Sequence, residues 1–347
     1  MKKMWAVYAL IVALLYLVGN TLYTAGSFKS IHPHTEGTIL EVYGNTPGPE
    51  DMTMDQESGL LFISSCDRRK LLNGLDSDDG IYVLSPDSPL PPRKVATTYK
   101  GEFHPHGISF LKGETASLFV VNHNKAGNFI EIFEYRVDTL FHLRSITDES
   151  MCCPNDVVAV AKDKFYVTND HGTRQGLKRT MEDYLRLPFS YLLYFDGQRF
   201  SKVYGGLRYG NGVNISHDGA LLYLSTTTGQ NLLTFNRNLE TGVLTLKNKT
   251  PLKTGLDNID VDSEGNLWIA AHPKLLAFVS HSKDPAKVSP SQVLKLVPDN
   301  SGGYTVEEMF LDEGINLSGS SVAVHYKNDL FVGAVFESKI LRIALPK

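Results

Sequence analysis

The chain has 347 residues, of which 42% are hydrophobic and 21% are charged, and its formal net charge is -4. This composition is ordinary for a globular protein and carries no signature of disorder. The acidic balance argues against a general nucleic-acid-binding protein, because such proteins need a basic surface to displace counterions from phosphates.

The first residues form a segment that differs from the rest of the chain. Lys2 and Lys3 precede an uninterrupted apolar run over residues 4–18. A basic start followed by an apolar run is typical of a signal peptide, and the weakly polar residues 19–26 extend the run toward the roughly 20 residues that span a bilayer. We therefore expect residues 1–25 to be a signal-anchor or a signal peptide. In both cases the body lies on the extracytoplasmic side, either anchored to the membrane or secreted after cleavage.

Cysteine spacing predicts no metal-binding motif. The chain has Cys66, Cys152 and Cys153, and adjacent cysteines seldom bond to each other because the ring is strained. We therefore expect structural cysteines, and a bridge from Cys66 to Cys152 or Cys153 stays open. Sequons that permit N-glycosylation occur at Asn214, Asn248 and Asn316.

One template recurs six times: a polar residue, a short apolar run, a turn, and a second apolar run ending in polar or small residues. The copies span residues 50–65, 106–123, 155–171, 211–227, 257–273 and 321–336. Each copy is typical of a β-hairpin, and starts about 45 to 65 residues apart suit four-stranded propeller blades. We therefore predict an all-β fold, a six-bladed β-propeller with four-stranded blades over residues 26–347, plus an N-terminal apolar helix. An open sandwich would need another reason for six similar hairpins.

One further helix is expected inside the propeller. Residues 180–183 resemble a capping box, and apolar residues follow on one helical face until Pro188. Such a helix either packs on the propeller surface or serves as a lid or membrane-docking element.

The polar residues that begin the template copies indicate a metal site. In a propeller the first strand of each template lines the central tunnel, so these residues meet at one end of the axis. They are all carboxylates or amides: Glu50, Asn155, Asn211, Asp257 and Asn258. Oxygen ligands of this kind favour calcium over zinc or copper. Each residue alone fits a turn at strand entry better, but recurrence at one template position favours a metal.

A second polar set lies one residue further along two of these strands. Asp51 follows Glu50 and Asp156 follows Asn155, and adjacent strand residues point to opposite sides. These carboxylates can hold a second, deeper ion, with a backbone carbonyl near Ile108 completing its shell.

Two histidines are expected at the same end of the tunnel. His106 begins a template copy and His123 ends it, so they lie at the same end of paired strands and can touch. A histidine pair beside a Lewis-acidic ion suits hydrolysis, because the metal polarises a carbonyl while a base activates water. We expect His106 to be the base and His123 its supporting partner, whereas His32 and His34 fit ordinary surface histidines.

At these residues the chain resembles the paraoxonase (arylesterase) family of calcium-dependent lactonases. The likeness covers most of the chain after about residue 44. Its motifs are PEDM (49–52), HPHGIS (104–109), VVNH (120–123), PNDVVAV (154–160), TNDH (168–171), NGVNIS (211–216) and LDNI (256–259). The resemblance implies a six-bladed propeller that holds two calcium ions.

The resemblance also implies roles for individual residues. Residues implied to hold the catalytic ion are Glu50, Asn155, Asn211, Asp257 and Asn258. Those implied to hold the structural ion are Asp51, Asp156 and the Ile108 carbonyl. His106 and His123 would form the dyad that activates water, with an acidic residue such as Asp257 as the alternative base.

Substrates and membrane attachment are implied in the same way. Family members open lipophilic lactones, hydrolyse aryl esters and organophosphates as side activities, and are anchored by a retained apolar N-terminus. One departure concerns the disulfide that joins the family's termini, because this chain has no cysteine near residue 40 or in its last blade. Closure of the propeller must then rest on strand pairing between the first and last segments.

Two alternative functions remain open. A sugar-lactonase propeller with one divalent ion shares the Glu and Asn ligands, although the paired Asp51 and Asp156 argue against it. A non-catalytic propeller would bind a partner through its mouth and use calcium only for structure, although it would not require His106 and His123.

Overall fold

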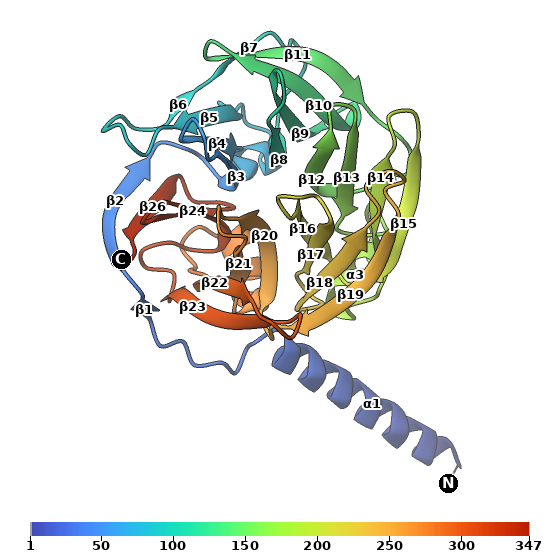
Figure 1. Ribbon diagram of the computed structural model, residues 1–347. Coiled ribbons are helices and arrows are strands. Elements are labelled where there is room, and N and C mark those ends of the chain that lie inside the picture. Colours follow the sequence, from blue (N-terminus) through green and yellow to red (C-terminus); the bar gives the residue numbers. More distant parts are fainter. Residues whose placement is uncertain (1, 347) are drawn as a thin grey trace.

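The computed structural model describes residues 2–346. The first residue of the predicted segment 1–25 and the last residue of the predicted domain 26–347 lie outside this range. Six sheets lie around a central axis like the sectors of a disc (Figure 1). This arrangement confirms the predicted six-bladed propeller of four-stranded blades. Two blades carry an additional short strand at the outer edge.

The blades follow one another along the chain, and each runs outward from its innermost strand; the outer-edge strands of blades 2, 5 and 6 come earlier in the chain than the blades they join. Blade 1 comprises β3 (Pro49–Asp55), β4 (Leu60–Ser65), β5 (Gly80–Leu84) and β6 (Arg93–Lys94). Blade 2 comprises β8 (Pro105–Leu111), β9 (Ala116–Asn124), β10 (Gly127–Arg136), β11 (Thr139–Ile146) and the short β7 (Ala96–Thr97). Blade 3 comprises β12 (Pro154–Ala161), β13 (Lys164–Asn169), β14 (Ser190–Phe195) and β15 (Phe200–Leu207).

The second half of the disc repeats the pattern. Blade 4 comprises β16 (Gly210–Ile215), β17 (Leu221–Thr226), β18 (Asn231–Arg237) and β19 (Leu244–Pro251). Blade 5 comprises β20 (Gly255–Val261), β21 (Leu267–His272), β22 (Ser291–Pro298), β23 (Tyr304–Asp312) and the short β1 (His34–Thr35). Blade 6 comprises β24 (Ser320–Tyr326), β25 (Asp329–Ala334), β26 (Lys339–Ala344) and β2 (Thr38–Gly44).

Strand pairing between the two ends of the chain closes the disc. The N-terminal β2 runs antiparallel to the C-terminal β26, from Thr38 opposite Ala344 to Gly44 opposite Lys339. All three cysteines are free thiols, so the bridge left open for Cys66 does not form. Backbone hydrogen bonds and side-chain packing therefore close the disc, as the sequence predicts.

The core consists of six apolar clusters, one between each pair of neighbouring blades. The cluster between blades 6 and 1, for example, joins Tyr43 and Phe331 to Met52, and all three are buried. Each sheet thus buries both faces, because a neighbour covers each side. This explains why polar and apolar residues do not alternate cleanly in the repeat.

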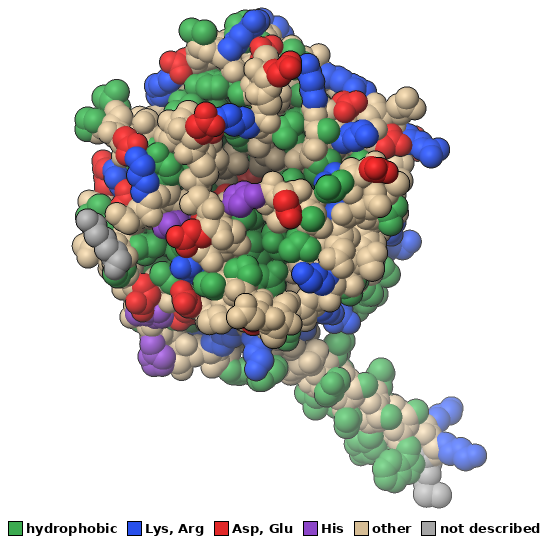
Figure 2. Space-filling model, in the orientation of Figure 1, with side chains coloured by type: hydrophobic (Ala, Val, Ile, Leu, Met, Phe, Trp, Pro, Cys, Tyr) green, Lys and Arg blue, Asp and Glu red, His purple; other side chains and the backbone are tan. Residues whose placement is uncertain are grey.

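Within residues 2–346, four helices accompany the blades: α1 (Lys2–Thr24), α2 (Arg68–Leu72), α3 (Leu177–Tyr184) and α4 (Leu275–Lys283). The 23-residue α1 projects from the disc (Figure 1) and buries none of its side chains. Apolar side chains cover it along its length (Figure 2). By length and composition α1 is able to cross a membrane.

The helix expected over residues 180–188 starts earlier than predicted. Gly176 precedes the first turn of α3, and its N-cap forms no side-chain hydrogen bond. The predicted capping box at residues 180–183 is therefore wrong. Glu182 is buried and accepts a hydrogen bond from the Gly172 N–H at 2.8 Å. This side chain therefore holds α3 to the segment that follows β13.

Candidate functional site

A β-bulge interrupts every innermost strand at its first residues. The register shifts lie between residues 49/51, 105/108, 154/157, 210/213, 256/259 and 320/322. A bulge bends the strand and re-aims its side chains. Two consecutive residues at a bulge can therefore both lie near the same group. Asn258 Nδ2 donates to Glu50 Oε1 at 3.2 Å, and the neighbouring Asp257 is close enough to Glu50 for their charges to interact.

Glycines let the innermost strands approach one another closely at the bulges. A Cβ atom on Gly107 would lie 2.4 Å from the Asp156 Cα, and one on Gly212 would lie 2.7 Å from the Asn258 Cα. Both distances are shorter than any side chain tolerates. The glycines of the HPHGIS and NGVNIS motifs thus make room for the polar residues beside them.

The predicted ligands of the catalytic ion come together at this end of the tunnel as one group of buried oxygens, called here the oxygen cluster: Glu50, Asn155, Asn211, Asp257 and Asn258. Four acceptor atoms in it are buried and have no hydrogen-bond partner: Glu50 Oε2, Asn155 Oδ1, Asn211 Oδ1 and Asn258 Oδ1. Buried acceptors without partners are rare, and each needs an explanation.

Two of the three amide nitrogens of the oxygen cluster are, in contrast, partnered. Asn211 Nδ2 donates to Thr227 Oγ1 at 3.0 Å, and Asn258 Nδ2 donates to the Glu50 carbonyl at 3.0 Å. These bonds fix which way each amide faces and leave its oxygen without a donor. A cation is the partner that such a set of acceptors fits, and oxygen donors of this type suit calcium.

Buried carboxylates concentrate negative charge here. Burial and the charge of Glu50 raise the pKa of Asp257, although the contact with His272 at 2.8 Å acts to lower it. Burial would also raise the pKa of Glu50, but His106 and Arg68 beside it outweigh that effect and lower the pKa to about 2. Glu50 is therefore ionised at any physiological pH.

Asp51 and Asp156, the predicted ligands of the deeper ion, tie neighbouring blades together. Asp51 accepts the Ile108 N–H at 2.6 Å, and Asp156 accepts the Val213 N–H at 2.7 Å. Burial raises the pKa of both carboxyl groups, and their mutual repulsion adds to this for Asp51. A cation between them would reverse both effects.

His106 and His123 form a directed chain of hydrogen bonds. Asn128 donates through Nδ2 to the carbonyls of residues 151 and 152, so its Oδ1 is the acceptor for His123 Nδ1 at 2.8 Å. Burial and the charge of His106 lower the pKa of His123 to about 4, so this ring is neutral with its proton on Nδ1. Its Nε2 must then accept from His106 Nδ1, 2.9 Å away.

With its Nδ1 proton directed at His123, His106 turns Nε2 toward the oxygen cluster, and this nitrogen has a free lone pair whenever the ring is neutral. That nitrogen lies 3.4 Å from Glu50 Oε1 and thus borders the oxygen cluster. The geometry is that of a base whose tautomer is set by a second histidine and an amide.

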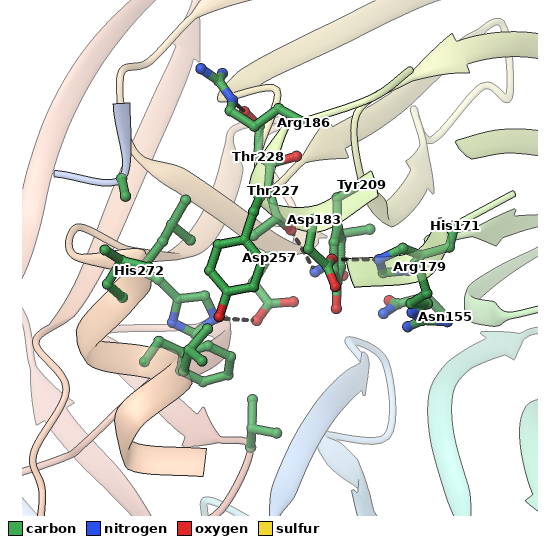
Figure 3. Close-up of a pocket in the computed structure, with 18 of the residues that line it drawn as sticks. Asn155, His171, Arg179, Asp183, Arg186, Tyr209, Thr227, Thr228, Asp257 and His272 are labelled. Atoms are coloured by element: carbon green, nitrogen blue, oxygen red, sulfur yellow. Dashed lines mark hydrogen bonds and ion pairs between the residues drawn. The ribbon is translucent and has the colours of Figure 1, made fainter. Parts of the chain in front are cut away.

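A cavity of about 610 Å³ adjoins the oxygen cluster and His106. Figure 3 shows His272 beside Asp257, and His171 of blade 3 beside Asp183 of α3, at this cavity. Apolar side chains form another part of the wall: Leu275, Leu276, Phe278, Val279, Val335 and Phe336. The last turn of α1 also lines the cavity through Thr21 and Thr24.

Two residues of this site were not predicted. Asn128 carries no repeat signal, because it lies on the third strand of its blade, outside the template. Arg68 lies on the short α2, and its guanidinium reaches 3.7 Å from Glu50 Oε2. The only sequence signal for Arg68 is a run of three basic residues, 68–70, just after a template copy, and such runs are usually solvated.

The chain matches a family model described as Arylesterase over residues 94–343. It is 31% identical to serum paraoxonase/arylesterase 2 of Gallus gallus over 319 residues, 89% of each chain. It is 32% identical to serum paraoxonase/arylesterase 1 of Homo sapiens over 244 residues, 69% of this chain and 68% of the relative.

Solved structures with the same fold are more distant in sequence. A luciferin-regenerating enzyme aligns with a TM-score of 0.56 at 14% identity, covering 90% of this chain and 95% of that structure. Regucalcin of Agrobacterium tumefaciens, described as a calcium-binding protein, aligns with a TM-score of 0.55 at 13% identity, covering 90% and 94%. A gluconolactonase of Xanthomonas campestris aligns with a TM-score of 0.54 at 15% identity, covering 92% and 99%.

We predict that Gly107→Ala destabilises the protein by about 1–3 kcal/mol or prevents folding, because the added methyl collides with the Asp156 backbone. Thermal unfolding measures the effect. Gly113→Ala is the matched control, since its nearest atom would be an ordinary 3.5 Å away. Equal melting temperatures for the two variants would contradict the close approach of these strands.

Proposed function

Because this chain belongs to the arylesterase family of paraoxonases, and is therefore an ester- or lactone-hydrolysing enzyme, we propose that it uses calcium to open lipophilic lactones, with aryl esters as side substrates. The observation that carries the proposal is the set of unpartnered acceptors in the oxygen cluster beside a histidine with a free lone pair. A hydrolytic site needs both a positive charge and a base, and these residues suit both.

The oxygen cluster would hold the catalytic ion, and Asp51, Asp156 and the Ile108 carbonyl would hold a second one. When bound, calcium supplies positive charge that stabilises the oxyanion of the opening lactone or ester. Glu50 stays ionised for this task because its pKa is about 2. Asp51 and Asp156 already brace the innermost strands, so their ion would have a structural role.

His106 would act as the general base. Its Nε2 takes a proton from the attacking water, and the resulting imidazolium lies 3.4 Å from the Glu50 carboxylate that stabilises it. His123 keeps accepting from His106 Nδ1 throughout, since its own pKa of about 4 keeps it neutral. Asn128 prevents His123 from changing tautomer.

The cavity supports a lipophilic substrate. Its apolar wall comes from α4 and from the two residues that follow β25. On the same side of the cavity Phe278 stacks on His272, with ring centroids 3.9 Å apart. Arg68 Nη1 is buried without a partner and could donate to a substrate oxygen. An acyl chain would thus lie along the apolar wall while its carbonyl faces the oxygen cluster.

The membrane is the second partner that we propose. Residues 1–25 would anchor the chain, and residues 26–347 would form the hydrolase domain on the extracytoplasmic side. The exposed, apolar α1 supports this. Its end is held to the propeller, because the Leu275 N–H donates to the Ala25 carbonyl at 2.9 Å and Gln230 Nε2 donates to the Thr24 carbonyl at 2.7 Å.

Calcium removal should lower lactone hydrolysis by about 100- to 1,000-fold, the usual effect of losing oxyanion stabilisation. The full chain is stripped with a chelator in detergent, assayed on a panel of lactones and aryl esters, and then reloaded. Elemental analysis of the reloaded protein should give two calcium ions. Full turnover by the calcium-free protein would contradict the proposal. A count of one calcium ion per chain would favour a sugar-lactonase-like site. Absence of lactone and ester hydrolysis in the presence of calcium would favour a non-catalytic binding module.

His106→Gln should lower kcat by about 100- to 10,000-fold, because the variant lacks a base. Calcium affinity and melting temperature should stay as in the wild type. His34→Gln, at the outer edge of blade 5, is the control and should leave kcat unchanged. A His106→Gln enzyme with wild-type turnover would assign the base to another residue.

Asn128→Ala should lower kcat by about 10- to 100-fold with little change in KM, because His123 loses the acceptor that fixes its tautomer. Asn128→Asp retains an acceptor and should recover most of this loss. Steady-state kinetics over a range of pH checks both variants. Equal activity of the two would show that the amide acts only through packing.

A further inference from the structure

Three metal-ligating side chains of different types meet beside the mouth, outside the oxygen cluster. Cys66 directly follows β4, Asp79 directly precedes β5, and His104 directly precedes β8. One ligand atom from each lies within 4.8 Å of the other two. The three segments belong to neighbouring blades 1 and 2, so the cluster joins these blades at the mouth.

Asp79 Oδ2 lies near both other ligand atoms, at distances comparable to those between ligands of a tetrahedral zinc site. Asp79 Oδ2 lies 3.3 Å from Cys66 Sγ and 2.7 Å from His104 Nδ1. Zinc binds sulfur at about 2.3 Å and nitrogen or oxygen at about 2.0–2.2 Å, which places neighbouring ligands about 3.3–3.5 Å apart. Asp79 Oδ2 and His104 Nδ1 would move apart by about 0.6–0.8 Å to admit the ion.

The surroundings already orient the ligands. Glu102 Oε1 lies 3.3 Å from His104 Nε2, so this nitrogen can carry the proton and leave Nδ1 free for a metal. The Asp67 N–H donates to Asp79 Oδ1 at 2.8 Å, which turns Oδ2 toward the cluster. A carboxylate behind a ligating histidine is a usual feature of zinc sites.

The thiol is protected until a metal arrives. Cys66 is only 3% exposed, so solvent oxidants barely reach its thiol. Metal binding would convert Cys66 from thiol to thiolate and release that proton to solvent. The half-buried His104, whose side chain is 16% exposed, gives the ion a way in.

We propose that Cys66, Asp79 and His104 bind one zinc ion, distinct from the calcium of the oxygen cluster. A donor set of one sulfur, one nitrogen and one oxygen suits zinc and not calcium. Three protein ligands leave one position for water. The expectation of purely structural cysteines missed this site because only one ligand is a cysteine and the others lie 13 and 38 residues further along the chain.

Such an ion would tie together the segments that carry two residues of the active site. Arg68 follows Cys66 by two residues, and His106 follows His104 by two. Zinc would therefore hold α2 and the start of β8 in a fixed relation to Glu50.

Cobalt(II) is the probe that tests the proposal in the full chain, with calcium present in excess. Bound cobalt should give one thiolate-to-metal charge-transfer band per chain in the near ultraviolet, and zinc should displace it. The band should be absent from Cys66→Ser, and Glu102→Gln should weaken cobalt binding about 10- to 100-fold. Cys152→Ser is the matched control and should retain the band.

No band in the wild type would overturn the proposal and leave a hydrogen-bonded triad only. A band that survives Cys66→Ser, or that Cys152→Ser abolishes, would assign the metal elsewhere and overturn it equally. X-ray absorption at the zinc edge of the wild-type protein needs no variant to fold. It should show one sulfur at about 2.3 Å, and a shell of nitrogen and oxygen alone contradicts the assignment.

Discussion

Buried carboxylates crowded at one end of the propeller tunnel are the constraint on which the rest of the structure depends. Glu50, Asp51, Asp156 and Asp257 are all buried, and Asp51 and Asp257 are each close enough to Glu50 for their charges to interact. Burial without a counter-charge favours protonation, and the raised pKa of the three aspartates expresses this. Divalent ions would remove that cost and turn the repulsion into cohesion between blades.

The architecture is organised around bringing these groups together. Bulges at the start of each innermost strand re-aim consecutive residues, and Gly107 and Gly212 remove the side chains that would keep strands apart. Ring closure serves the same end, because β2 pairs with the last strand of the chain and leads directly into β3, which carries Glu50. The site therefore relies on the pairing of the two chain ends, with no disulfide to support it.

Much of this was predictable because a repeat constrains many residues at once. Six copies of one hairpin imply six blades, and the first residue of each copy faces the axis, so Glu50, Asn155, Asn211 and Asp257 follow from template position together with residue type. His106 and His123 follow from the same logic, as the two ends of one hairpin.

Features outside the template could not be predicted in this way. Asn128 and the Cys66 cluster depend on contacts between segments that no period relates. The start of α3 was misplaced because Thr180 and Asp183 fit a capping box in sequence, whereas in the fold Asp183 pairs with His171. Strict alternation along the strands failed where the bulges lie, since a bulge depends on neighbouring strands and not on local sequence.

A crystal structure of the full chain grown with calcium tests the central claim most directly. The account predicts an ion about 2.3–2.6 Å from the oxygens of Glu50, Asn155, Asn211 and Asn258, with anomalous scattering that identifies it as calcium. Water alone among these oxygens, or an Arg68 guanidinium turned in to replace the ion, would contradict it.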